Sequence, residues 1–198
     1  NEADFVHISN EVAFTEECPV PEPPFSASRF CSRPKYFELL DYIGANVIEL
    51  TGNHLMDYGE DAFQEMMATL QDSGIDYYGG GVNLEDAIKP LSVDHHGNQF
   101  VFFGCNIPGP DNVFATDDYG GANPCDMEAL VEEVEQVLTT GQIPVVTFQH
   151  YEACQIEPMS KQRIDMNRLA EAGAVIVSGS QAHCAQGMTF VGDSFVHY

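Results

Sequence analysis

Basic residues are scarce in this sequence. Only 7 of its 198 residues are lysine or arginine, against 31 aspartates and glutamates, so the formal net charge at pH 7 is −24. A surface this acidic repels phosphate backbones and anionic lipid headgroups. We therefore expect no nucleic-acid partner and no anionic membrane surface as a partner, while metal cations and cationic groups remain suitable ligands.

Long apolar runs are also absent. No run approaches the roughly 18 residues that a membrane-spanning helix needs, and the stretch from Asn1 to Phe5 lacks the basic start and apolar centre of a signal peptide. We expect no direct membrane insertion by this segment. Apolar residues make up 44% of the chain, enough for a sizeable core. Because no repeat, low-complexity tract or linker divides it, we predict a single domain over residues 1–198.

The cysteines include no C-x-x-C pair, which argues against a structural zinc site or a redox motif. There are six of them: Cys18, Cys31, Cys105, Cys125, Cys154 and Cys184. They are either buried free thiols in a cytosolic protein or disulfides in an exported one, and we favour export. Loop context suggests Cys18 with Cys31, across a proline-rich loop over residues 18–33, and Cys105 with Cys125. Cys154 and Cys184 would then pair by default.

Short β-rich runs alternate with helical patterns, which indicates the α/β class. The predicted strands cover residues 4–8, 46–50, 76–78, 91–94, 99–105, 143–148, 174–178 and 194–198. The predicted helices run from Pro34 to a stop at Gly44, over residues 62–70 with a stop at Gly74, and over residues 127–138 and 158–172. Between two strands, His95-His96-Gly97-Asn98 reads as a hairpin turn. We interpret its two histidines as turn residues rather than ligands.

Polar side chains directly follow several predicted strands, where open α/β sheets place their ligand sites. These residues are Asn10, Glu11, Asn53, His54, Asp57, Gln149, His150, Glu152, Gln181 and His183. Imidazole nitrogens with carboxylate or amide oxygens are the ligands of a divalent cation. Three histidines, each beside an amide or carboxylate residue, favour a functional site over three unrelated structural histidines.

The motif Gly52-Asn53-His54, between a strand and a helix, resembles the Gly-Asn-His motif of the calcineurin-like metallophosphoesterases. The wider pattern is similar to the CapA family of poly-γ-glutamate capsule proteins. The matching pieces, in chain order, are Ser9-Asn10-Glu11, Thr51 to Gly59, Gly79 to Ala87 with Pro90, His150 to Glu152 with Pro158 and Gln162, and Ala172 to Ala174 followed by Gly179 to His183. The resemblance covers nearly the whole chain. It implies a metallophosphatase-like α/β/β/α sandwich.

The sequence departs from the family pattern at both ends and at two internal places. The family's first strand, with its Gly-Asp motif and an aspartate ligand, is not seen, and the chain stops at Tyr198 within the last motif, so we expect a fold incomplete at both ends. Residues 179–183 read Gly-Ser-Gln-Ala-His where the family commonly has Gly-His-His-Pro-His. The block from Gln149 to Glu152 is one residue short, so either Gln149 or His150 occupies the ligand position. Amide oxygens bind Zn, Mn or Fe more weakly than imidazole does.

The resemblance implies a divalent metal, Mn, Zn or Fe, or a degenerate site without one. Its ligands would be Glu11, Asn53, His150 and His183, with Glu11 either a ligand or a group that orients one. His54 would protonate the leaving group or stabilise charge. Asp57 would hold His54 or its loop, or would only be a favourable charge at a helix N-terminus. Asn10, Gln149, Glu152 and Gln181 would substitute for ligands or orient them.

The resemblance therefore implies an exported cell-envelope protein of capsule or poly-γ-glutamate synthesis or polymer handling. Its substrate would be an anionic polymer or a phosphoester. Two functions stay open: a metal-dependent phosphoester hydrolase, and a non-catalytic binding or assembly module with a degenerate metal site. Because the net charge is −24, a polyanion would approach only through bound cations or a local basic patch, and Arg29, Arg33 and Lys35 form the one visible cluster of basic residues.

Overall fold

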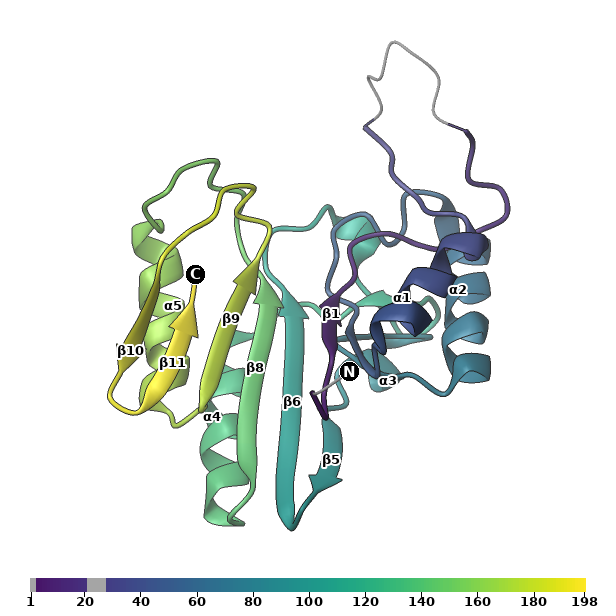
Figure 1. The fold of residues 1–198 in the computed structure, drawn as a ribbon. Helices are drawn as coiled ribbons and strands as arrows, with labels where there is room; N and C mark the ends of the chain where they lie inside the picture. The colour runs from purple at the N-terminus through teal and green to yellow at the C-terminus, as the bar shows by residue number, and fades with distance from the viewer. Residues whose placement is uncertain (1–2, 21–27) are drawn as a thin grey trace.

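A computed structural model describes residues 3–20 and 28–198 of the chain (Figure 1). Its larger sheet has the strand order β10-β11-β9-β8-β6-β5. The bounds of these strands are β5 (Leu91–His95), β6 (Asn98–Asn106), β8 (Ile143–Gln149), β9 (Ile176–Ser180), β10 (Met188–Val191) and β11 (Ser194–His197). The strands β6, β8, β9 and β11 run parallel, whereas β5 and β10 are antiparallel edges.

A smaller parallel sheet consists of β1 (His7–Ser9), β2 (Val47–Glu49) and β3 (Asp76–Tyr78). A two-stranded ladder joins β4 (Gly80–Gly81) to β7 (Gly121–Ala122). The α-helices are α1 (Glu38–Ile43), α2 (Gly59–Ser73), α3 (Leu84–Ala87), α4 (Met127–Thr139) and α5 (Ser160–Glu171). Short 3₁₀ turns are η1 (Pro34–Phe37) and η2 (Asp111–Val113).

Side-chain alternation along β2 shows how the layers stack. Ile48 packs in a core cluster with residues of α1 and α2. Its neighbour Val47 points the other way and packs with Tyr78, Phe102 and Val145, between the two sheets. A third cluster fills the space between the larger sheet and the helices α4 and α5, which lie on its far face in Figure 1. The order of layers is therefore α/β/β/α, and the predicted α/β class is confirmed.

Local signals set the helix ends as the sequence indicates. Pro34 begins the turn that leads into α1, and Gly44 ends that helix in the left-handed conformation with φ 74°. Gly74 ends α2 in the same way with φ 70°. Asp126 caps α4 by accepting hydrogen bonds from the backbone of Glu128 and Ala129. None of the helices among residues 3–20 and 28–198 has the length and apolar character needed to cross a bilayer.

Several predicted bounds were wrong. The first strand begins at His7 rather than at residue 4, because Asn46 bonds the backbone of Asp4 and Val6 through its side chain and holds that segment out of the ladder. Strand β9 begins at Ile176 and extends to Ser180, two residues later than predicted at each end. Strand β10 and helix α3 were not predicted. Of the predicted loop over residues 18–33, residues 21–27 lie outside the described residues.

Two disulfides are present, Cys18–Cys31 and Cys105–Cys125. These are the two pairings that the loop context suggested. Cys154 and Cys184 are free thiols, so the third pairing, assigned by default, is not formed. The Cys154 thiol instead donates to the Glu152 carboxylate at 3.1 Å. That hydrogen bond raises the pKa of Cys154, because it favours the protonated thiol.

Candidate functional site

A pocket of about 300 Å³ opens where the carboxyl ends of strands from both sheets meet. Its lining residues are Ser9, Glu11, Gln149, Ser180, Gln181 and His183. Three of the lining residues end a strand: Ser9 in β1, Gln149 in β8 and Ser180 in β9. The structure thus brings together four of the residues proposed from the sequence, Glu11, Gln149, Gln181 and His183, at the edge where α/β sheets hold their ligands.

Asn53 and Gln149 bond to each other beside this pocket. The Asn53 backbone N–H donates to Gln149 Oε1 at 2.9 Å, and Gln149 Nε2 donates to Asn53 Oδ1 at 2.7 Å. Both amide oxygens that the family resemblance offered as metal ligands therefore already accept a hydrogen bond. The pair fixes the loop after β2 against the end of β8.

The side chain of His150 faces α5, whereas that of its neighbour Gln149 lines the pocket. It is fully buried, and its Nε2 is 3.0 Å from Asp165 Oδ2 on α5. Asp165 also accepts from Lys161 Nζ at 2.6 Å. Burial lowers the pKa of His150, and the nearby Asp165 partly opposes that shift. The metal-ligand role given to His150 does not fit this position, and of the two alternatives Gln149 is the residue in the pocket.

Glu11 approaches the loop after β2 closely at Gly52. A Cβ on Gly52 would lie 2.3 Å from Glu11 Cα and 2.5 Å from its carbonyl oxygen, so only glycine fits there. Among the described residues, the buried Oε1 of Glu11 has no hydrogen-bond partner. An unpaired buried acceptor is costly. The pocket therefore offers one carboxylate oxygen to a hydrogen-bond donor or a cation.

His54 and Asp57 form a pair next to the pocket. His54 Nδ1 lies 2.7 Å from Asp57 Oδ2, which also accepts from the Phe30 backbone N–H at 2.7 Å. The Phe30 ring meets the His54 ring edge-on, with centroids 4.6 Å apart. Of the two roles considered for Asp57, these contacts favour the one in which it holds His54. The pairing through Nδ1 leaves His54 Nε2 to face another partner.

Residues in a strained backbone conformation occur at the pocket as well. Among the described residues, four that are not glycine have positive φ: His96, Cys154, Gln181 and His183. Gln181 and His183 line the pocket, and the Cys154 N–H donates to the carbonyl of Ala182 between them at 2.9 Å. Non-glycine residues in this conformation cost free energy and occur preferentially at functional sites.

Glu49 is a buried acid that the sequence interpretation missed. It is 1% exposed at the end of β2, and its carboxyl group bonds to Thr51, Thr147 and Ser9. Burial raises its pKa, and these hydrogen bonds oppose the rise. Because Ser9 also lines the pocket, Glu49 supports one of its walls. A single acid within the apolar run of residues 47–50 was the available signal.

Two other proposed residues are not in the pocket lining. Asn10 donates through its side chain to the Val12 carbonyl at 2.9 Å. Glu152 bonds to the Cys154 thiol. Neither contact points to a ligand role.

The described donor set does not fit the transition-metal centre implied by the family resemblance. The pocket contributes one carboxylate, from Glu11, and one imidazole, from His183, and its remaining groups are amides and hydroxyls. Within residues 3–20 and 28–198, the group of three His, Cys, Asp or Glu ligand atoms close enough to hold a metal lies elsewhere, at Asp4, His95 and His96. Zinc, manganese or iron would find too few strong ligands in this pocket.

Two curated proteins are similar to this chain in sequence. The chain is 22% identical to the PGA biosynthesis protein CapA of Bacillus subtilis (strain 168) over 162 residues, which are 81% of this chain and 43% of that relative. It is 21% identical to the capsule biosynthesis protein CapA of Bacillus anthracis over 159 residues, 78% of this chain and 39% of that relative. The chain thus spans about two fifths of the length of these curated relatives.

The model of one protein family, described as bacterial capsule synthesis protein PGA_cap, matches residues 1–198. The chain therefore belongs to the bacterial capsule synthesis protein family.

Proposed function

We propose that this chain is the polymer-binding part of a capsule synthesis protein, and that its pocket holds poly-γ-glutamate by hydrogen bonds rather than by a metal centre. The observation that carries this proposal is the composition of the pocket. Its lining consists of two amides, two hydroxyls, one carboxylate and one imidazole. Such a set binds polar groups in both directions, as donor and as acceptor.

The chemistry of poly-γ-glutamate matches these groups. Each repeat carries one backbone amide and one α-carboxylate. Gln181 and Ser180 offer donors and acceptors to the amide, and the unpaired Glu11 Oε1 accepts from an amide N–H. His183 supplies an imidazole N–H donor to a carboxylate oxygen. Glu11 and the net charge of −24 repel the carboxylates, so binding needs a cationic group nearby.

Arg29 supplies that group beside the pocket. Its Nε donates to the Asp57 carbonyl at 2.6 Å, and its guanidinium lies 4.5 Å from the centre of the Tyr58 ring. Arg29 is exposed. It is thus held next to the His54–Asp57 pair while its remaining N–H donors face solvent, where a polymer carboxylate pairs with them.

An exported location in the cell envelope belongs to the same proposal. Two disulfides support it, because disulfides persist in oxidising compartments. The relatives named for capsule biosynthesis support it as well.

A second candidate function is phosphoester hydrolysis, which the His54–Asp57 pair favours. Water would attack phosphorus as the bond between phosphorus and the leaving-group oxygen breaks, and the proton that water loses would pass to solvent. The His54 imidazolium, held by Asp57 through Nδ1, would donate its Nε2 proton to the leaving-group oxygen. This proton transfer is carried by the chain's own residues and calls on no metal, because the donor groups of the pocket do not fit one.

The test is a binding titration of the full-length protein with poly-γ-glutamate oligomers. We expect Gln181→Ala to lower the affinity at least about tenfold, because a lost hydrogen bond in a site leaves its partner unpaired. Gln136→Ala is the matched control, since Gln136 is exposed on α4. Equal affinities of wild type and Gln181→Ala would refute the proposed pocket. Turnover of phosphodiesters that disappears in His54→Ala would favour the second function.

A further inference from the structure

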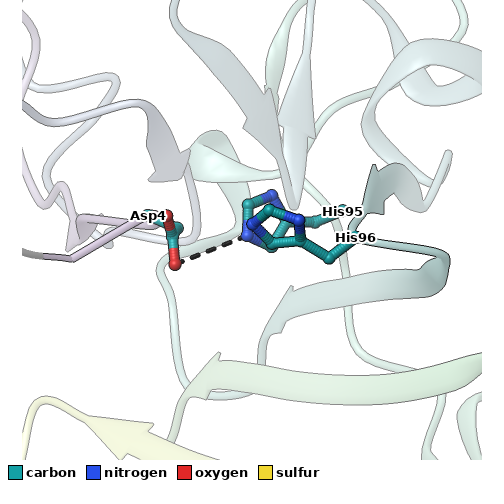
Figure 2. A group of neighbouring side chains, drawn as sticks. All are labelled: Asp4, His95 and His96. Atoms are coloured by element: carbon teal, nitrogen blue, oxygen red, sulfur yellow. Dashed lines mark ion pairs between the residues drawn. The ribbon is translucent and has the colours of Figure 1, made fainter.

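A second group of metal-type ligands lies far from the pocket, at the hairpin between β5 and β6. Asp4, His95 and His96 each place one ligand atom within 4.8 Å of the others. Figure 2 shows the two imidazole rings side by side, with the Asp4 carboxylate beside them. The ring centroids of His95 and His96 are 4.1 Å apart.

The turn geometry places the two histidines together. His95 pairs with Asn98 at the end of the ladder, which leaves a two-residue turn of His96 and Gly97. Both turn residues have positive φ, 49° and 82°, as a type I′ turn requires. Asparagine is the usual residue at the first of these positions, and histidine is one of the other residues that adopt this conformation more readily than most. The turn therefore accommodates His96 and presents its imidazole next to His95.

Separate contacts hold Asp4 against the hairpin. Asn46 donates to the Asp4 carbonyl at 2.8 Å and accepts from the Val6 N–H at 2.9 Å. Phe5 lies between Asp4 and Val6 in the sequence, and its ring packs edge-on against that of His95, with centroids 5.0 Å apart. It also packs against Phe100 at 5.8 Å, on β6. Contacts of the Asp4 backbone and of the Phe5 ring therefore place the Asp4 carboxylate beside the histidines, and the carboxylate takes no part in those contacts.

One distance in this group matches the ligand spacing of a tetrahedral metal site. His95 Nε2 lies 3.4 Å from Asp4 Oδ2. Zinc bonds to nitrogen and oxygen of about 2.1 Å put neighbouring ligands of a tetrahedron about 3.4 Å apart. His95 Nε2 is buried and makes no hydrogen bond among the described residues. A buried ring nitrogen without a hydrogen-bond partner, at ligand spacing from a carboxylate, is available to coordinate an ion.

We propose that Asp4, His95 and His96 bind a borderline divalent cation of the zinc type. Two imidazoles and one carboxylate are a donor set that Zn²⁺, Ni²⁺ and Cu²⁺ share. They leave a fourth position for water or another group. The net charge of −24 raises the local concentration of cations. A bound ion joins the segment before β1 to the edge of the larger sheet, and stabilises the folded protein.

This site is separate from the pocket and does not depend on the proposed function. The hairpin lies at the start of β6, whereas the other end of that strand, Asn106, pairs with Gln149 at the pocket. Asn98 and Asn106 are eight residues apart along β6, and at a rise of about 3.3 Å per residue the hairpin end and the pocket end of this strand are about 26 Å apart. Metal bound at one site is therefore distinguishable from metal bound at the other by substitution.

The experiment is a titration of the full-length, EDTA-stripped protein with Zn²⁺, followed by calorimetry and by the thermal midpoint. His96→Asn keeps the turn, because asparagine is favoured at its first position. Asp4→Asn keeps the size of the side chain. We expect either change to weaken one zinc site at least about tenfold and to reduce the zinc-dependent rise in the midpoint.

His183→Asn is the matched control, because it removes an imidazole from the pocket instead. We expect it to retain the hairpin zinc. A midpoint in EDTA equal to wild type shows that His96→Asn is folded. The proposal is overturned if the wild type binds no zinc, if both hairpin variants bind zinc as the wild type does, or if only His183→Asn loses it.

Discussion

The side chain of Gln149 exchanges two hydrogen bonds with Asn53, accepting one at 2.9 Å and donating one at 2.7 Å. The two residues lie 96 positions apart in the chain. The pair therefore ties the loop after β2, in the smaller sheet, to the end of β8 in the larger sheet. The pair places Gln149 in the pocket lining, and each of its two side-chain amide oxygens accepts one hydrogen bond within the chain.

Gln149→Ala removes both of these hydrogen bonds. We expect the free energy of unfolding to fall by about 1–3 kcal/mol, because the Asn53 groups lose their partner, and we expect polymer binding to weaken. Urea unfolding and a binding titration measure the two effects. Gln136→Ala on α4 is the control, with changes within about 0.5 kcal/mol. Unchanged stability and binding in Gln149→Ala would contradict the role of the pair.

His150→Gln tests the structural role of His150. Burial lowers the pKa of His150 in the folded protein, so the unfolded chain binds a proton more readily. Stability contributed by the neutral imidazole is therefore lost as pH falls below its ordinary pKa of 6.5 towards the lower folded pKa. We expect His150→Gln to be less stable near pH 7, to lose less stability between pH 7 and 5, and to bind polymer normally once folded.

Urea unfolding across that pH range provides the first readout, and binding of the folded variant provides the second. If His150→Gln abolished binding and left both stability and its pH dependence unchanged, His150 would belong to the site after all.

The pH dependence at Glu49 has the opposite sign. Burial raises the pKa of Glu49, so the folded protein holds that proton more tightly than the unfolded chain. Stability therefore decreases as pH rises from the ordinary carboxyl pKa of 4.5 through the raised folded pKa. Glu49→Gln removes this decrease, and we expect the variant to gain stability relative to wild type as pH rises. Glu132→Gln, an exposed change on α4, serves as the control. If the difference in free energy of unfolding between Glu49→Gln and wild type stayed constant across this pH range, the pKa of Glu49 would not be raised in the folded protein.

Gly52→Ala tests the close contact with Glu11. The added Cβ would lie 2.3 Å from Glu11 Cα, so backbone must move. We expect a loss of about 2 kcal/mol or more, within the range of overpacking, together with weaker polymer binding. Gly187→Ala is the matched control, because a Cβ there meets nothing within 4 Å and its φ is not positive. Thermal unfolding of both variants decides this, and equal midpoints would show that Glu11 has room to shift.

Much of the fold could be predicted because its signals are local. Gly44 and Gly74 end helices through their own conformational freedom, and Pro34 opens one. The site was harder to predict from the sequence, because the residues that line it depend on strand register. Whether Gln149 or His150 faces the pocket is decided by β8 pairing, which sets Gln149 opposite Ser180. A one-residue change of register exchanges the two faces. No short-range pattern contains that information.

The hairpin between β5 and β6 shows the same division between local signals and tertiary packing. The prediction that His95 and His96 are turn residues was correct for His96, but His95 is the last residue of β5 and pairs with Asn98. Their neighbour Asp4 is about ninety positions away in sequence and is placed by Asn46 and Phe5. The proximity of these three residues follows from tertiary packing alone.

The most direct test of the central claim compares polymer binding by the full-length protein in excess EDTA and in added Mn²⁺ or Zn²⁺, alongside phosphodiester turnover. We predict that poly-γ-glutamate oligomers bind with the same affinity in EDTA as in metal, that Arg29→Gln weakens this binding, and that Lys89→Gln, which removes a charge paired with Glu85, does not. Binding or turnover that requires the added metal and is lost in His183→Ala would contradict the account.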